Sequence, residues 1–168
     1  MANDQMFLEI SEQQEKLLDY WGDHIGPNGC VPRSAINPGH VRELLSNISI
    51  IELRRKGTST FRLAGSKLRD IVGAEARGRS VSSIQGGELE PWCDAILSVL
   101  DTRLPVSGLT EREDGSFHLW LRLPLLDRDG ELTQVMCHDE LLRADHNRPL
   151  KRRRVDEFIP QVSARYAA

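Results

Sequence analysis

The sequence predicts an α+β fold: a five-stranded antiparallel sheet with helices on one face, plus an N-terminal amphipathic helix. Two observations carry this prediction. Segments with strand-like apolar patterns fall into two groups, residues 48–64 and 106–138, and turn signals separate the strands within each group. Segments with helical spacing of apolar residues precede the first group and lie between the two groups. A single sheet with helices packed against it buries both kinds of apolar surface.

The N-terminal helix is expected to begin near Ser11. Ser11 and Gln14 fit a capping box, in which each side chain satisfies a free backbone N–H group of the other residue. An apolar stripe follows at helical spacing: Leu17, Leu18, Trp21 and Ile25. Such a stripe must cover either the chain's own sheet or another subunit.

A second helix and the first β-hairpin come next. Asn37 can cap the helix, and Pro38 fits its first position, where the missing N–H group costs nothing. β-branched residues then predict a strand over residues 48–53. A turn over residues 56–59 leads into a second strand over residues 60–64, and the two strands are expected to pair antiparallel.

Glycines divide the middle of the chain. The second strand ends at Gly65, and a short helix ends at Gly73, where a left-handed backbone is favoured. The run from Gly73 to Ser80 nearly matches the phosphate-binding pattern G-x-x-x-x-G-K-[ST]. That loop requires a strand before it and a helix after it, and the sequence predicts neither, so it does not indicate nucleotide binding.

The longest predicted helix spans residues 89–102 and is followed by three strands, over residues 106–111, 117–124 and 132–138. In the middle strand of the three, one face carries Phe117, Leu119, Leu121 and Leu123, and the other carries His118, Trp120 and Arg122. We expect the leucine face to meet the helices between the two groups of strands. The Trp120 face is expected to lie in solvent or in an interface, or else to be covered by the N-terminal helix of the same chain.

The order of these elements and several short motifs resemble the PAS domain family, and in detail a bacterial stand-alone PAS subgroup with a Tyr-Trp pair on its N-terminal helix. The resemblance covers roughly residues 16–142. It rests on these motifs, in order: Tyr20-Trp21, Pro32-Arg33, Pro38, Leu44-Leu45, Ile50-Ile51-Glu52, Phe61-Arg62-Leu63-Ala64-Gly65, Gly78-Arg79, Pro105, Leu123-Pro124-Leu125 and Asp129-Gly130.

The resemblance implies a sensor or adaptor in bacterial signal transduction that acts by protein–protein interaction. It implies a signalling partner such as a histidine kinase or its scaffold, and no enzymatic activity. We expect residues 1–15 to form an N-terminal extension, residues 16–142 the PAS domain, and residues 143–168 a basic, flexible tail.

The sequence lacks the residues with which some PAS domains bind haem or flavin. A haem-binding PAS domain typically offers a histidine on or near the long helix, and residues 89–102 contain none. Neither Cys93 nor Cys30 lies in the Asn-Cys-Arg-Phe-Leu-Gln setting of a flavin photoreceptor. We therefore expect no cofactor, and we expect any ligand to be small and apolar. Its expected contacts are Phe61, Leu63, Trp92, Ile96, Leu119 and Leu121, although a filled core is the simpler expectation.

Composition and charge give no support for nucleic-acid binding, membrane insertion or a metal site. The net charge of −3 gives no general attraction to nucleic acid, and no apolar stretch approaches the length of a membrane span. The N-terminus lacks the features of a signal peptide, so we expect a cytoplasmic protein. Three scattered cysteines suggest neither disulfides nor a metal site. We interpret the run Cys137-His138-Asp139-Glu140 as a sheet-end cluster without chemistry, since neighbouring strand residues point to opposite faces.

Two surfaces are candidates for contact with partners. The basic run Lys151, Arg152, Arg153 and Arg154 is a candidate docking tail, and the alternative function it suggests is that of a nucleic-acid-associated regulator. A two-fold homodimer is expected through the N-terminal helix and the outer sheet face, with Leu17, Trp21, Ile25 and Trp120 in the interface.

Overall fold

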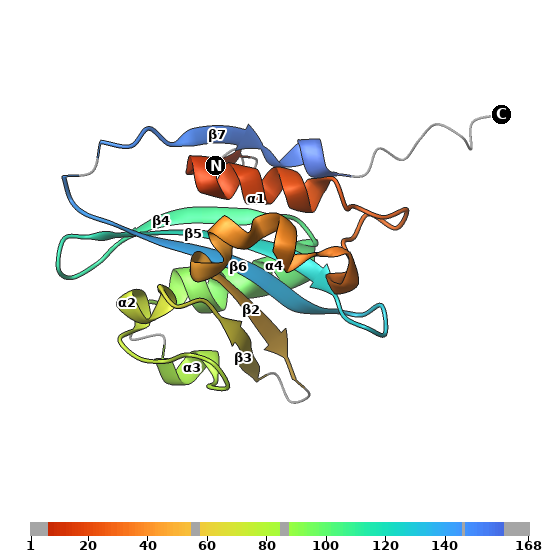
Figure 1. Ribbon diagram of the computed structural model, residues 1–168, viewed down its shortest axis with the longest axis horizontal. Coiled ribbons are helices and arrows are strands. Elements are labelled where there is room, and N and C mark those ends of the chain that lie inside the picture. Colours follow the sequence, from red (N-terminus) through yellow and green to blue (C-terminus); the bar gives the residue numbers. More distant parts are fainter. Residues whose placement is uncertain (1–6, 55–57, 85–87, 146, 160–168) are drawn as a thin grey trace.

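A computed structural model of the chain describes residues 7–54, 58–84, 88–145 and 147–159. Its centre is a five-stranded antiparallel sheet with the strand order β3-β2-β6-β5-β4 (Figure 1). The strands are β2 (Ile48–Leu53), β3 (Ser59–Ala64), β4 (Val106–Glu111), β5 (Phe117–Leu126) and β6 (Leu132–Leu142). The predicted α+β class and all five predicted strands are therefore confirmed.

One face of the sheet, called here the inner face, is covered by the elements between β3 and β4. These are α2 (Leu68–Val72), α3 (Val81–Ile84), the π-helix η4 (Glu90–Asp94) and α4 (Ala95–Thr102). The single long helix expected over residues 89–102 is thus a π-helical turn that continues into an α-helix. Gly73 ends α2 with a φ of 77°, as the sequence predicts, because glycine adopts this left-handed conformation at little cost.

The opposite, outer face is covered by the two ends of the chain. The N-terminal part supplies β1 (Phe7–Ile10), α1 (Glu12–Gly22) and the 3-10 segments η2 (Arg33–Ala35) and η3 (Pro38–Asn47). The predicted capping box of Ser11 and Gln14 is present at the start of α1. Trp21 is only 1% exposed, and its indole Nε1 donates a hydrogen bond to the Pro124 carbonyl at 3.0 Å. The helix therefore covers its own sheet.

The C-terminal segment is also part of the fold. β7 (Lys151–Arg154) pairs antiparallel with β1, and η5 (Val155–Phe158) follows it directly. Figure 1 shows β7 and α1 lying side by side above the sheet. Val155 and Phe158 are buried in the same apolar cluster as Trp21. The expected flexible tail is thus wrong for residues 151–158, while residues 160–168 lie outside the described residues.

The two faces of β5 are oriented opposite to the expectation. Leu121, Leu123 and Leu125 belong to the outer cluster beneath α1, whereas the Trp120 face meets η4 and α4. The prediction failed because both faces of the sheet are covered. Alternation along a strand separates two faces but does not show which helices cover each of them. No helix in the described ranges has the length and apolar character needed to cross a membrane.

Candidate functional site

Five ionisable side chains form a connected network between the inner face of the sheet and the helices. We call it the inner-face ion network. Its members, in order of contact, are Arg112, Glu88, His118, Asp139 and Arg122. Charged side chains are rarely buried unless they are paired. A chain of alternating positive and negative side chains inside the domain therefore distinguishes this site from the apolar core around it.

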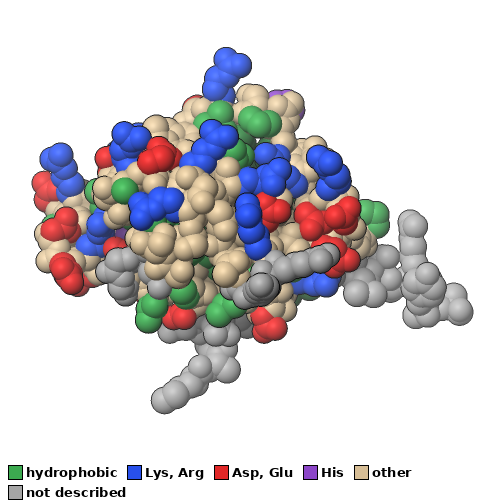
Figure 2. Space-filling view, turned by 90° about the horizontal axis from the view of Figure 1, so that it is seen from below, with side chains coloured by type: hydrophobic (Ala, Val, Ile, Leu, Met, Phe, Trp, Pro, Cys, Tyr) green, Lys and Arg blue, Asp and Glu red, His purple; other side chains and the backbone are tan. Residues whose placement is uncertain are grey.

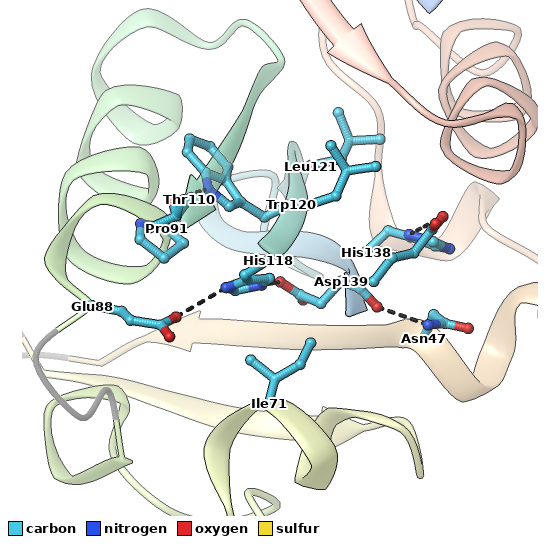
Figure 3. A network of polar contacts seen from close by, with 12 residues as sticks. Asn47, Ile71, Glu88, Pro91, Thr110, His118, Trp120, Leu121, His138 and Asp139 are labelled. Carbon is cyan, nitrogen blue, oxygen red and sulfur yellow. Dashed lines mark hydrogen bonds and ion pairs between the residues drawn. The ribbon is translucent and has the colours of Figure 1, made fainter. Parts of the chain in front are cut away.

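Strand register brings three members of the network together. Trp120 on β5 lies opposite Asp139 on β6, so His118 and Arg122 flank Asp139 on the same sheet face. Asp139 Oδ1 accepts hydrogen bonds from His118 Nε2 at 2.6 Å and from Arg122 Nη2 at 2.8 Å. Figure 3 shows His118 pointing toward Asp139, and Asn47 donating to the Asp139 carbonyl from beyond it.

Glu88 links the network to the helices. Its carboxylate lies 3.0 Å from His118 Nδ1 and 3.4 Å from Arg112 Nε. Arg112 also donates through Nη2 to the Ile71 carbonyl on α2, at 2.9 Å. Glu88 and Arg112 thereby connect His118 to α2 and to the segment before η4.

Arg122 fills the space beneath η4. Its guanidinium is fully buried, donates through Nε to the Pro91 carbonyl at 2.8 Å, and lies 4.4 Å from the centre of the Trp92 ring. A buried cation gains from stacking on an aromatic face, and more so when it is shielded from water. Its neighbour Trp120 lies against Gly108, where a Cβ atom would sit 2.2 Å from the indole, so only glycine permits this contact.

Electrostatics favour the charged form of each central residue. Burial alone lowers the pKa of His118, but its hydrogen bonds to Asp139 and Glu88 outweigh burial and raise that pKa above its ordinary value. Burial raises the pKa of Asp139, but the Arg122 charge and the His118 hydrogen bond lower it further than burial raises it. The network thus places His118 between two carboxylates, Glu88 and Asp139, which favour its protonated form.

The inner-face ion network contains no evident nucleophile. Cys137 lies opposite Arg122 in the sheet, but burial raises the pKa of its thiol to about 12, and a thiol in that state is a poor nucleophile. Within the described ranges, no group of three or more His, Cys, Asp and Glu side chains is placed to hold a metal ion. What this geometry can do is couple a proton on His118 to the packing of α2 and η4.

Comparison with protein-family profiles decides the family. A profile described as PAS domain matches residues 10–136, which is most of the chain. The chain belongs to the PAS domain family. The family is one of sensory domains, and its members commonly mediate protein interactions and dimerisation.

Solved structures and curated sequences were compared as well. A light-oxygen-voltage domain studied with a flavin analogue is 17% identical, with a TM-score of 0.47, and the match covers 64% of this chain and 87% of that one. The light-state structure of the blue-light photoreceptor Aureochrome1 LOV is 18% identical, with a TM-score of 0.44 and coverages of 62% and 88%. An RNA-binding light-oxygen-voltage receptor is 14% identical, with a TM-score of 0.43 and coverages of 83% and 39%. The comparison with curated proteins found no match.

The six side chains predicted to contact a ligand do not line one pocket of this PAS domain. Phe61, Trp92 and Ile96 pack together on the inner face, but Leu121 lies in the outer cluster. Leu119 shares the strand face of Leu121, and Leu63 is 41% exposed. The expectation is therefore wrong as a single site, for the reason given above: the leucine face of β5 meets α1.

The residues predicted for a dimer interface are mostly internal. Leu17 and Trp21 are buried under the PAS domain's own outer face, and Ile25 is half-buried. Trp120 is buried between β4 and α4, with its Nε1 donating to Thr110 Oγ1 at 3.0 Å. These side chains are not available as interface anchors. The two-fold dimer itself stays a prediction.

The predicted docking tail is neutralised by the chain itself. Lys151 pairs with Glu15, and Arg153 contacts Asp19 at 2.9 Å. Arg154 pairs with Asp156, and the Arg152 guanidinium lies 3.9 Å from the centre of the Phe7 ring. A strand of four basic residues is stable here because acidic residues of α1 and η5 face it.

Sequence reasoning missed the inner-face ion network. It treated Asp139 as part of a cluster at the end of the sheet, whereas Asp139 lies within β6 and is buried. A signal was present: His118 and Arg122 are polar residues in a strand otherwise rich in leucine. His118 and Arg122 lie two residues before and two residues after Trp120, on the same strand face. Once both faces of the sheet are known to be covered, polar side chains at such positions must be buried and are expected to have hydrogen-bond partners.

Proposed function

We propose that this chain is a PAS adaptor of the bacterial subgroup with the N-terminal Tyr-Trp helix, and that it acts by contact with a signalling protein. The proposed partner is a histidine kinase or a scaffold of one, and no turnover is involved. The observation that carries the proposal is the filling of the space between the inner face and α4 by the protein's own side chains.

That space is occupied by aromatic rings and a guanidinium. The Trp92 ring lies 5.5 Å from the ring of Phe61 and 5.5 Å from that of His118, and Arg122 stacks on its face. A bulky cofactor would have to displace a buried cation from its carboxylate partner. Contact with another protein needs no such change, and it is therefore the mode of signalling that this interior favours.

A small apolar ligand is the second candidate, because one hollow is lined by two of the predicted contacts. It lies beside Trp92 and Ile96, is bordered by Leu53 and Val81, and has a volume of about 200 Å³. Ligand pockets usually have about 300–1,000 Å³, so this hollow suits only a very small molecule.

The nucleic-acid alternative loses its main support. Phosphate binding needs cations that are free to replace counterions. Three of the four basic residues of β7 already form ion pairs within the chain.

Capture of the tagged protein from its own cells, with identification of bound proteins, tests the proposal. We expect a histidine kinase or a scaffold protein to be enriched over a tag-only control. The purified protein should also be colourless. A visible absorption band from a tightly bound haem or flavin, or capture that enriches no signalling protein, would overturn the proposal.

A further inference from the structure

Positive charge is concentrated in one short part of the chain. Residues 54–79 contain eight of the 22 Lys and Arg residues but only two of the 25 Asp and Glu residues. The rest of the chain is therefore clearly acidic. We call the exposed basic side chains described in this part the basic face: Arg54, Arg62, Lys67, Arg69, Arg77 and Arg79.

Backbone pairing brings part of the basic face together along β3, the edge strand of the sheet. The segment after α2 returns along β3, where the Phe61 N–H group donates to the Arg79 carbonyl at 3.0 Å and Gly78 N–H donates to the Phe61 carbonyl at 2.7 Å. Arg77 and Arg79 thereby lie beside Arg62. Arg69 joins them through Glu75, which it contacts at 3.1 Å.

Part of this charge has no ion-pair partner among the residues that the structure describes. Arg62 pairs with Glu52 and Arg69 pairs with Glu75, but Lys67, Arg77 and Arg79 form no ion pair with any residue that the structure describes. Figure 2 looks onto this side of the molecule and shows Lys and Arg side chains spread over the middle of the face, with larger acidic groups toward its left and right. The basic face thus differs from β7, whose cations are largely paired.

The chemistry of the face fits a protein better than a nucleic acid. Arginine predominates, and its planar guanidinium can bind a carboxylate through two parallel hydrogen bonds. Leu63 lies next to Arg62 and is 41% exposed, which offers an apolar contact of the kind found in protein interfaces. Glu52, Asp70 and Glu75 lie among the cations and would repel a continuous line of phosphates.

We propose that the basic face is the docking surface of this PAS domain and that its partner presents an acidic segment, with Asp or Glu side chains arranged around an apolar residue that meets Leu63. This inference rests on the proposed adaptor function and adds to it the face and the partner chemistry. Opposed charges steer the encounter and set the register, and the apolar contact slows dissociation.

Fluorescence anisotropy tests this surface with three labelled probes: a helical peptide of Glu and Leu, the same peptide with Lys in place of Glu, and a DNA duplex. We expect the Glu peptide to bind best, with affinity falling between about 50 and 200 mM salt. The double variant Arg77→Glu, Arg79→Glu should weaken this binding by about tenfold or more, because like charges would then face each other. The matched control Arg128→Glu, Arg143→Glu makes the same change in net charge at exposed positions elsewhere and should bind like the wild type.

Each alternative result overturns the inference. Tighter binding of the duplex would mean a nucleic-acid surface, equal losses in both double variants would mean a net-charge effect, and no binding of the Glu peptide would remove the proposed chemistry. Capture from cells separates this inference from the adaptor function. If the Arg77→Glu, Arg79→Glu variant captures the same signalling protein as wild type, the face is wrong while the adaptor function stands. If wild type captures none, the adaptor function fails, and the peptide assay still reports on the face.

Discussion

Replacing Asp139 by asparagine removes the central anion of the inner-face ion network while keeping its shape. The carboxylate accepts hydrogen bonds from His118 and Arg122 at 2.6 and 2.8 Å, and all three side chains are almost completely buried. Without it, the Arg122 cation keeps its bond to the Pro91 carbonyl but has no carboxylate partner among the described residues. Removing one partner of a buried ion pair typically costs about 3–5 kcal/mol. His118 can relieve part of this cost by losing its proton, so we expect a loss of about 3 kcal/mol, at the lower end of that range.

Urea unfolding at neutral pH measures this loss. The matched control is Asp19→Asn, because Asp19 also pairs with an arginine, Arg153, at 2.9 Å, but its side chain is 54% exposed. Exposed pairs contribute about 0–1 kcal/mol, so this variant should unfold almost like the wild type. If Asp139→Asn loses no more stability than Asp19→Asn, the network does not stabilise the fold in the way described.

Two further predictions follow from buried groups outside the network. Burial lowers the pKa of His138 to about 4, so the unfolded chain takes up a proton there more readily than the folded one. The free energy of unfolding should therefore fall by about 3 kcal/mol as the pH drops from about 6.5 to 4. Urea unfolding at several pH values should show this fall in the wild type and a smaller one in His138→Leu, and equal pH dependence of the two proteins would contradict the prediction. Phe158 is 8% exposed and packs near Trp21, so Phe158→Ala should cost about 3–5 kcal/mol in the same assay, whereas an unchanged midpoint would mean that η5 does not dock on α1.

Local signals allowed much of the fold to be predicted. Ser11 and Gln14 form the expected capping box, Gly73 has the expected left-handed backbone, and the strands form where alternation and turn signals coincide. Each of these depends on residues close together in the sequence, and such interactions are visible without a structure.

Features that depend on distant parts of the chain were not predictable in the same way. The four basic residues of β7 become a strand because β1 pairs with them and α1 supplies Glu15 and Asp19, more than 130 residues earlier. Trp120 is buried because α4 and Gly108 approach it. The network depends on the register of β5 and β6, which brings Asp139 between His118 and Arg122.

The central claim is that two carboxylates in the interior of this PAS domain, those of Asp139 and Glu88, favour the protonated form of His118. Following the imidazole resonances of His118 by NMR as the pH is varied tests it most directly. Because the hydrogen bonds to Asp139 and Glu88 outweigh burial, we predict a pKa for His118 above its ordinary value of 6.5, and a lower pKa in Asp139→Asn. A His118 that titrates at or below 6.5 in the wild type, or that is indifferent to the Asp139 substitution, would contradict the account.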